Sequence, residues 1–430
     1  MISTIDNKYT EKRTICIIVN GCHENHYDAA LLKKSLGNDE RFRFVNGYKK
    51  ANIIILLGCA NTQHMENETR ALIEHVKQTK KDNSEVMVLG CISRISPDFE
   101  LNVGDNVDNY GIMESQFREI ENASSVSSLY KVDDEDICQF RDDRKAKLFG
   151  GRSVDGDADT LNKISFPVKK MLFYGVKYWK DFFESKINLV NSKTYCIKIA
   201  TGCLGNCSYC VIKTSRGKVR SKPLDRILEE FRKGLDLGYQ QFALIGTDLG
   251  DYGGDQGNDL IDLLEKMTSL PGRFFIKLRN VNPRWIIAQS ENFYDLLRRG
   301  NIRYILSPIQ SGSNRILELM NRGYKKEDFE NIVKKIRSSY PSVLIQSQVI
   351  VGFPTESEED FMETRHLVNQ NLFHYMDVFR YSDRNGTKSQ TIYPKVPESV
   401  IINRYRKLLF KSLLNYPIQK LQIIYGLNYV

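Results

Sequence analysis

The stretch YCIKIATGCLGNCSYC (195–210) joins an apolar, β-branched run to a loop that holds Cys203, Cys207 and Cys210. The run predicts a buried strand, and the glycines that follow mark the point where it ends. Three close thiols with no fourth cysteine nearby suit a four-iron cluster that leaves one iron open to a non-protein ligand. The alternative is a zinc site completed by a distant residue, because zinc normally takes four tetrahedral ligands.

Six strand-like runs, separated by helical patterns, predict a partial βα barrel over residues 193–395. The helical pattern after the first strand, at 223–238, begins with proline and ends with glycine, as helices commonly do. In such barrels the functional residues lie at the carboxyl ends of the strands, and the three-cysteine loop directly follows the first strand. The expected strands are YCIKIAT (195–201), FALIG (242–246), FFIKLRN (274–280), RYILSPI (303–309), LIQSQVIV (344–351) and MDVFRY (376–381).

An α/β domain with a parallel sheet is predicted at residues 1–104. Each of its three apolar strands is followed by Gly-Cys, which gives Cys22, Cys59 and Cys91. Because parallel strands end at the same edge of a sheet, we expect these thiols to meet in space. The expected strands are RTICIIVN (13–20), ANIIILLG (51–58) and EVMVLG (85–90).

The composition is that of a globular protein of two or three domains, with 430 residues, 41% hydrophobic and 27% charged. No apolar run reaches the roughly 20 residues of a membrane span, so no membrane partner is expected. The first residues lack the apolar segment of a secretory signal, and we therefore expect a cytoplasmic protein. In that compartment the nine cysteines are metal ligands or buried thiols rather than disulfides. The net charge of +9 suits nucleic acid, an acidic peptide or merely a basic surface.

Residues 105–192 lose this periodicity and are predicted to be a linker or insertion. They include an acidic run, DDED (133–136), and a basic aromatic stretch, KKMLFYGVKYWKDFF (169–183). The stretch could hold a nucleic-acid strand through charge and stacking. An amphipathic helix that packs its aromatic side chains inward is the preferred interpretation. The last residues, 396–430, are predicted to form a helical tail.

Taken together, the motifs resemble the radical-SAM methylthiotransferase family. The three-cysteine loop, with Tyr209 before its last cysteine, resembles the radical-SAM signature. GCHENHYD (21–28), LLGCA (56–60) and LGC (89–91) resemble the amino-terminal domain of the methylthiotransferases. The similarity covers almost the whole chain, because further segments match in the same order. They are YCVIKTSRGKVRSKP (209–223), IGTDLGDYG (245–253), QSGSNRILELMNRGY (310–324), VIVGFP (349–354) and YSDRNGT (381–387).

The resemblance implies an enzyme that uses two [4Fe–4S] clusters and S-adenosylmethionine (SAM). One cluster, which binds SAM, would cleave it to a radical that takes hydrogen from a C–H bond. The auxiliary cluster would carry a sulfur that is methylated by another SAM and then transferred. A reducing protein such as flavodoxin or ferredoxin would supply electrons. The implied ligands are Cys203, Cys207 and Cys210, which are also the catalytic set, for the SAM-binding cluster, and Cys22, Cys59 and Cys91 for the auxiliary cluster.

Contacts to SAM are expected at the strand ends of the barrel. The glycines among the expected residues permit a close approach of the backbone to a ligand. The expected cofactor-binding residues are Tyr209, Gly246, Gln310, Ser311, Gly312, Ser313 and Gly352.

The acceptor of the methylthio group is left between two classes. Familiar members of the family end in a small all-β TRAM module, and this sequence stops near where that module would begin. That feature favours a peptide or protein side chain as the acceptor. The alternative, carbon 2 of adenosine in tRNA, fits the positive charge and the segments 216–221 and 246–253, although Lys213 and Thr247 depart from that branch. A third hypothesis, a non-enzymatic iron–sulfur protein, predicts no SAM cleavage.

Overall fold

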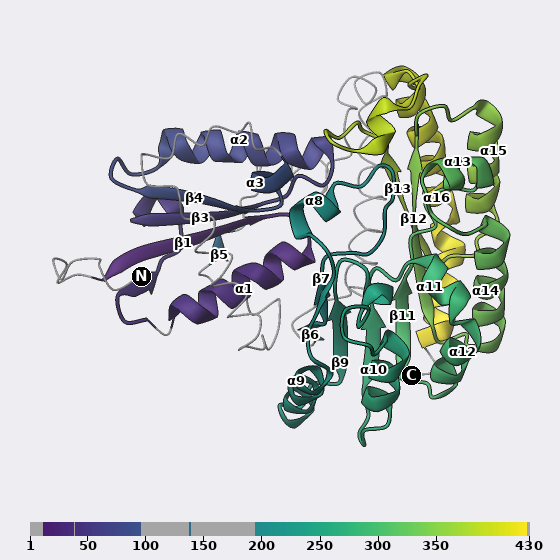
Figure 1. Cartoon of the computed structure of the whole chain (residues 1–430), viewed down its shortest axis with the longest axis horizontal. Helices are drawn as coiled ribbons and strands as arrows, with labels where there is room; N and C mark the ends of the chain where they lie inside the picture. Colours follow the sequence, from purple (N-terminus) through teal and green to yellow (C-terminus); the bar gives the residue numbers. More distant parts are fainter. Residues whose placement is uncertain (1–11, 38, 96–136, 139–193, 428–430) are drawn as a thin grey trace. The chain divides into compact units, whose positions relative to one another are not determined.

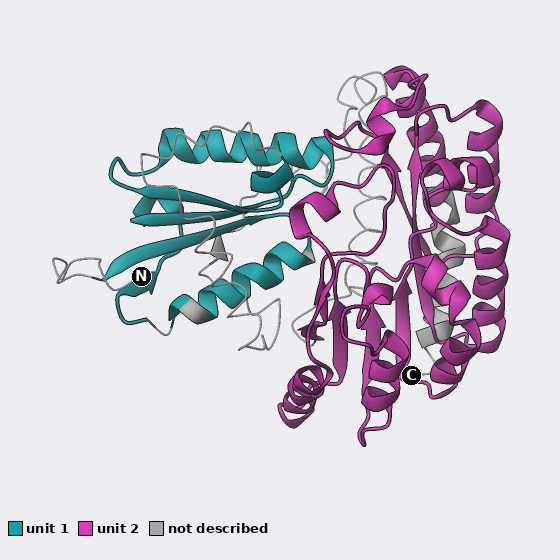
Figure 2. Cartoon of the chain, in the orientation of Figure 1, with its two compact units in different colours: residues 1–140 teal, residues 141–430 magenta. Residues whose placement is uncertain are grey.

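The computed structural model describes residues 12–37, 39–95, 137–138 and 194–427, which belong to two compact units (Figure 1, Figure 2). Unit 1 is Met1–Phe140 and unit 2 is Arg141–Val430. Each unit contains a parallel sheet with helices, so the predicted α/β class is confirmed. The predicted linker at 105–192, with its basic aromatic stretch, lies outside the described residues except for 137–138. None of the helices in the described ranges is long and apolar enough to cross a membrane.

Unit 1 is built on a parallel sheet with the strand order β2-β1-β3-β4, and β5 also pairs with β1. The central strand β3 is buried at every position, which explains why it reads as an unbroken apolar run. The three predicted strands are confirmed, whereas β2 was not predicted because three residues are too few to show a period of two. The strands are β1 Arg13–Asn20, β2 Phe42–Phe44, β3 Ile53–Gly58, β4 Glu85–Gly90 and β5 Ile137–Cys138.

The helices of unit 1 follow the strands as a parallel topology requires. Figure 1 shows α1 and α2 on opposite faces of the sheet. The second of these begins after Thr62, whose side chain accepts a hydrogen bond from the backbone N–H of Met65 and so caps the helix. The helical segments are α1 His23–Gly37, η1 Tyr48–Lys50, α2 Gln63–Thr79 and α3 Ile92–Ile95.

Unit 2 contains a six-stranded parallel sheet in the order β13-β12-β11-β10-β9-β6. In the described part of the chain β6 and β13 are its two edges, so the sheet is open, as expected for a partial barrel. All six predicted strands are present within a few residues of the expected ends. They are β6 Thr194–Lys198, β9 Gln241–Ile245, β10 Phe275–Leu278, β11 Ile302–Leu306, β12 Leu344–Val351 and β13 Tyr375–Arg380.

Helices alternate with these strands, and two of them begin with a capping box, at Asp259 and at Ser357. A small antiparallel pair, β7 Ala200–Thr201 with β8 Arg220–Ser221, follows β6. The long α16, Glu398–Leu427, occupies most of the segment predicted as a helical tail. The other helical segments are α8 Ile212–Arg216, α9 Leu224–Asp236, η3 Leu249–Asp251, α10 Leu260–Thr268, α11 Pro283–Ala288, α12 Ser290–Arg298, α13 Asn314–Leu319, α14 Lys326–Ser339, α15 Glu358–Asn369 and η4 Lys388–Thr391.

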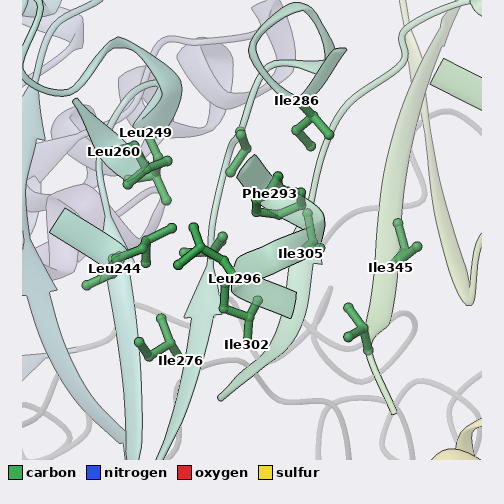
Figure 3. Packing of buried hydrophobic residues seen from close by; sticks show 14 of the residues in the cluster. Leu244, Leu249, Leu260, Ile276, Ile286, Phe293, Leu296, Ile302, Ile305 and Ile345 are labelled. Carbon is green, nitrogen blue, oxygen red and sulfur yellow. The ribbon is translucent and has the colours of Figure 1, made fainter. Parts of the chain in front are cut away.

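The main hydrophobic core of unit 2 lies between the sheet and its helices. Figure 3 shows Ile276 and Ile305 from the strands gathered with Phe293 and Leu296 of α12, and all four are buried. Along β10, Ile276 and Leu278 belong to this core, whereas Lys277 between them does not, as the alternation of side chains in a strand requires. A close-packed core of this kind fixes the carboxyl ends of the strands, where the loops of interest begin.

A buried histidine makes the stability of unit 2 depend on pH. The backbone N–H of Ile345 donates to His374 Nδ1 (3.0 Å), and the backbone N–H of His374 donates to the carbonyl of Ile345 (2.9 Å). Burial, and next the nearby Arg337, lower the pKa of His374 from 6.5 to about 3. The unfolded chain therefore takes up this proton first, so the contribution to stability is complete above pH 6.5 and is lost as pH falls from 6.5 toward 3.

We expect His374→Asn, whose side chain cannot take up a proton, to make the free energy of unfolding depend less on pH. As pH falls between those two pKa values, the free energy of unfolding of the wild-type protein decreases by up to about 1.4 kcal/mol per pH unit more than that of the variant. Thermal unfolding followed across pH measures the difference, with substitution of the exposed His366 as the control. Parallel profiles for wild type and His374→Asn would show that His374 does not act this way.

Candidate metal centres

The three-cysteine loop of unit 2 is held at its start by a position that only glycine can occupy. Gly202 has φ +84°, and a Cβ there would lie 2.1 Å from the carbonyl oxygen of Lys218. Its backbone N–H donates to Thr247 Oγ1 (3.2 Å), and the N–H of Cys203 donates to the carbonyl of Gly217 (3.3 Å). The loop is therefore fixed both by the segment after β9 and by the returning chain.

Inside the loop, Gly205 lies against two of the three sulfur atoms. A Cβ at this position would be 3.1 Å from Cys203 Sγ and 4.0 Å from Cys207 Sγ, so both sulfurs lie on the same side of the loop. The backbone N–H of Gly205 also donates to Cys203 Sγ (3.1 Å). The N–H of Cys210 donates to the carbonyl of Cys207 (3.2 Å), which turns the chain back. Three half-buried thiols are thus held within one short, tightly bonded loop.

Two carboxylates that the sequence analysis did not identify support this loop. Asp251 accepts from the backbone N–H of Leu204 (2.7 Å) and pairs with Arg284 (2.7 Å). Asp248 accepts from the backbone N–H of Gly250 (3.1 Å) and of Asn282 (3.2 Å). One ligand atom from each of Cys203, Asp248 and Asp251 lies within 4.8 Å of the other two. If the site held zinc instead of an iron–sulfur cluster, these carboxylates would be its oxygen ligands. Both, however, already accept hydrogen bonds from backbone N–H groups.

The electrostatics of the loop favour neutral thiols unless a cation is present. Burial, followed by the charges of Asp251 and Asp248, raises the pKa of Cys203 far above its ordinary value. Burial also raises the pKa of Cys210 to about 11, although backbone hydrogen bonds from Ile212 and Lys213 oppose this. A bound metal supplies the positive charge that such thiols need to lose their protons. Three sulfur donors in a partly buried loop are the chemistry of an iron–sulfur site.

A buried arginine, also missed by the sequence analysis, contacts the second cysteine. Arg322 is 5% exposed, and its Nη1 donates to Cys207 Sγ (3.2 Å). The end of α13 anchors the loop next to it, because Ser208 Oγ donates to the carbonyl of Leu319 (2.7 Å) and Asn321 Nδ2 to that of Asn206 (2.8 Å). The only signal for Arg322 in the sequence was its place in the segment 310–324.

Two of the predicted SAM contacts, Tyr209 and Gly246, lie close to the cysteine loop in sequence or in space. Tyr209 packs against a buried cluster that includes Met320 and Phe353, and burial raises its pKa well above the usual range. Gly246 follows β9, where a Cβ would approach the carbonyl of Ala200 to 3.2 Å. The roles of both residues toward SAM stay predictions.

The other predicted SAM contacts make hydrogen bonds that shape the strand ends. Gln310 has φ +75°, and its backbone N–H donates to the carbonyl of Gln348 (2.8 Å). Gly312 packs on α15, since a Cβ would lie 2.6 Å from the carbonyl of Glu363. These residues dock α13 on α15, and their contacts to SAM stay predictions. The remaining contacts are Ser311 Oγ to Thr364 Oγ1 (3.2 Å), Ser313 Oγ to Asp360 Oδ1 (2.6 Å) and Gly352 N–H to Glu356 Oε2 (2.9 Å).

In unit 1, the three Gly-Cys turns lie side by side at one edge of the sheet. The strands end in register, with Asn20 beside Gly58 and Gly58 beside Gly90. A Cβ on Gly21 would lie 2.9 Å from Cys59 Cβ, and a Cβ on Gly90 would lie 2.6 Å from the carbonyl of Gly58. The turns are therefore packed as closely as glycine allows. This register brings Cys22, Cys59 and Cys91 to neighbouring positions.

The three cysteines of unit 1 differ in exposure and in their position relative to α1. Cys59 and Cys91 are buried, at 4% and 6% exposure, whereas Cys22 is exposed. Cys22 directly precedes α1, and its carbonyl accepts from the N–H of His26 (3.2 Å). A helix amino terminus stabilises negative charge, including that of a thiolate. Cys16 and Cys196, in contrast, are fully buried within strands β1 and β6.

Comparisons with known proteins relate the two units to two families. Residues 197–368 match the radical SAM superfamily, and residues 14–109 match the family described as uncharacterized protein family UPF0004. The threonylcarbamoyladenosine tRNA methylthiotransferase MtaB of Aquifex aeolicus is 30% identical over 388 residues, which cover 90% of this chain and 85% of that protein. The ribosomal protein uS12 methylthiotransferase RimO of Chlamydia pneumoniae is 28% identical over 409 residues, which cover 94% of this chain and 78% of that protein.

The fold has a counterpart among solved structures. The radical S-adenosylmethionine methyltransferase TsrM of Kitasatospora setae superimposes with a TM-score of 0.53. The match covers 88% of this chain and 77% of that one. Because the sequence identity is 13%, the match shows similarity of fold and nothing about function. The fold of this chain is therefore similar to that of a solved structure over most of its length.

Proposed function

Because the chain belongs to the radical-SAM methylthiotransferase family, we propose that it replaces a C–H hydrogen of a macromolecular acceptor by a methylthio group. Members of this family are enzymes that use SAM and two [4Fe–4S] clusters. The observation that carries the proposal is that each unit of this chain places three cysteines at its strand ends, on one loop in unit 2 and on three adjacent turns in unit 1. Two separate three-thiol sites suit two clusters that each leave one iron open.

Cys203, Cys207 and Cys210 would hold the SAM-binding cluster, and Cys22, Cys59 and Cys91 would hold the auxiliary one. When bound, the first cluster supplies the electron for reductive cleavage of SAM, and the second supplies the sulfur that is methylated and transferred. The chain's own residues prepare the site in unit 2. Gly205 leaves room beside two sulfurs, and Asp251 fixes the backbone at Leu204. The partly buried Tyr209 side chain packs against the cluster that includes Met320 and Phe353.

We put forward tRNA adenosine as the first candidate acceptor. Relatives named for threonylcarbamoyladenosine in tRNA, such as that of Aquifex aeolicus, match along most of this chain. The net charge of +9 supports a polyanionic partner, since Lys and Arg side chains neutralise backbone phosphates. The enzyme would then act in the cytoplasm, with a flavodoxin or ferredoxin as the electron donor.

A protein side chain is the second candidate, and it is the acceptor that the sequence analysis preferred. A relative named for ribosomal protein uS12 covers nearly the same share of the chain, which supports this candidate. Both candidates share the same chemistry at the two clusters. They differ only in what presents the C–H bond.

Both candidates can be tested by mass spectrometry of the tRNA and the proteins of a host that lacks its own methylthiotransferases. We expect expression of this protein to give a methylthio-adenosine in digested tRNA that Cys203→Ala, the matched inactive variant, does not give. Unchanged tRNA together with a methylthio group on a ribosomal protein or other peptide would replace the first candidate by the second. If iron-loaded protein modifies neither tRNA nor polypeptides, the proposed function is wrong.

A further inference from the structure

The guanidinium of Arg322 is buried at the three-cysteine loop of unit 2, and each of its three nitrogen atoms donates a hydrogen bond. Nη1 donates to Cys207 Sγ (3.2 Å), and Nε donates to the phenol oxygen of Tyr324 (3.2 Å). Nη2 donates to the carbonyl of Pro308 (2.9 Å) and to Asn282 Oδ1 (3.3 Å). These contacts come from four different parts of the chain and hold the side chain in one orientation.

Three of these four acceptors are neutral oxygen atoms. Pro308 offers a backbone carbonyl and Asn282 a side-chain amide. The phenol of Tyr324 donates its own proton to the carbonyl of Ile309 (2.8 Å), which leaves its oxygen free to accept from Arg322. The phenol is also neutral, because burial raises the pKa of Tyr324.

Cys207 is therefore the one hydrogen-bonded partner of Arg322, among the described residues, that can carry a negative charge as a metal ligand. Buried charges in proteins are paired, because an isolated ion in a low-dielectric interior is very unfavourable. No carboxylate of the described chain forms an ion pair with Arg322. The hydrogen bond from Nη1 places the positive charge of this guanidinium directly against the sulfur of a proposed cluster ligand.

We propose that Arg322 is a positioning residue for the SAM-binding cluster: its N–H group, held against Cys207 Sγ, raises the reduction potential of that cluster. The inference rests on the proposed function, which places a [4Fe–4S] cluster on this loop. Hydrogen bonds to cluster sulfurs and nearby charge set the potentials of iron–sulfur centres. An N–H donor and a positive charge both stabilise the reduced cluster, which carries one more electron, over the oxidised one.

The orientation of Arg322 is set by contacts within the protein. Its backbone N–H donates to the carbonyl of Leu317 (3.0 Å), which closes the end of α13. Asn282, one of its acceptors, is held in turn by its own backbone N–H to Asp248 Oδ1 (3.2 Å). A donor fixed in this way costs no reorganisation when the cluster forms or is reduced.

The test measures the potential of this one cluster in the full-length chain. A parent in which Cys22, Cys59 and Cys91 are all replaced by alanine retains only the SAM-binding cluster. Parent and variants are reconstituted with iron and sulfide without oxygen, their iron content is measured, and the potential is titrated with dithionite by electron paramagnetic resonance. Arg322→Gln removes the charge, Arg322→Lys keeps the charge without the planar fork, and Arg337→Gln is the control. Arg337 is a half-buried arginine whose side chain donates, within the part of the chain that the structure describes, to the backbone carbonyls of Asn371 and Leu372.

We expect Arg322→Gln to lower the equilibrium constant for reduction at least tenfold, or about 59 mV for one electron. Arg322→Lys should lie between the parent and Arg322→Gln, and Arg337→Gln should match the parent. An iron-loaded Arg322→Gln with the potential of the parent overturns the inference and leaves the proposed function in place. If Arg322→Gln takes up no iron, Arg322→Lys decides, because a lower potential supports the inference and an unchanged one overturns it. A parent that takes up no iron contradicts the proposed function itself, and the inference with it.

Discussion

Replacing Cys207 by alanine is expected to stop the formation of 5′-deoxyadenosine from SAM. The loop offers three thiols, and removal of the central one leaves two ligands for a cluster that needs three. The substitution also leaves the buried guanidinium of Arg322 without the sulfur to which it donates (3.2 Å). Reductive SAM cleavage should therefore fall to the level of the protein-free reaction, as measured by chromatography of the reduced, iron-loaded protein.

The matched control for this variant is Cys196→Ala. Cys196 lies in β6, directly before the same loop, and is fully buried. Loss of its thiol changes the core of the unit without touching the loop, so SAM cleavage should persist. If Cys207→Ala still produced 5′-deoxyadenosine at the wild-type rate, residues 201–210 would not be the SAM-cleaving site.

Replacing Cys59 by alanine is expected to separate the two activities. Cys59 follows β3, the central strand of unit 1, and its turn lies between those of Cys22 and Cys91. Without it the auxiliary cluster lacks its middle ligand, while the loop of unit 2 is unchanged in sequence. SAM cleavage should continue, and methylthio transfer to the acceptor should be lost.

For this second variant, Cys16→Ala is the control, because Cys16 is a fully buried thiol in β1 of the same sheet. Both activities should survive that change apart from any loss of stability. Mass spectrometry of the acceptor measures the transfer, and assay of 5′-deoxyadenosine measures the cleavage. Full transfer by Cys59→Ala would refute a role for Cys59 as a cluster ligand.

Most of the fold could be predicted because its strands are long, apolar and buried. β1, β4 and β12 have the predicted ends, and β3 differs by two residues. β11 stops at Leu306, before the predicted end at 309, and Pro308 beyond it lacks the N–H that a ladder needs. β10 stops at Leu278, and Asn280, with φ +59°, takes the chain out of the extended conformation. Short β2 carried no pattern to detect.

Some residues of the candidate site are close together in the sequence, whereas others meet only in the folded chain. Cys203, Cys207 and Cys210 lie within eight residues, so their proximity follows from the sequence itself. Arg322 contacts Cys207 across 115 positions, and Asp251 contacts the backbone of Leu204 across 47. Neither residue has a local pattern that points to a sulfur ligand or to its loop. Such supporting residues come to light only when the strand ends converge in the folded barrel.

Methylthio transfer by this protein can be measured directly by following the methyl group of SAM. Reconstituted protein is reduced in the presence of tRNA or ribosomal protein, with SAM that carries deuterium in its methyl group, and the acceptor is analysed by mass spectrometry. We expect a deuterated methylthio group on a carbon of the acceptor, formed together with 5′-deoxyadenosine. Protein that is loaded with iron at both sites and cleaves SAM, yet transfers no labelled methylthio group to either acceptor, would contradict this expectation.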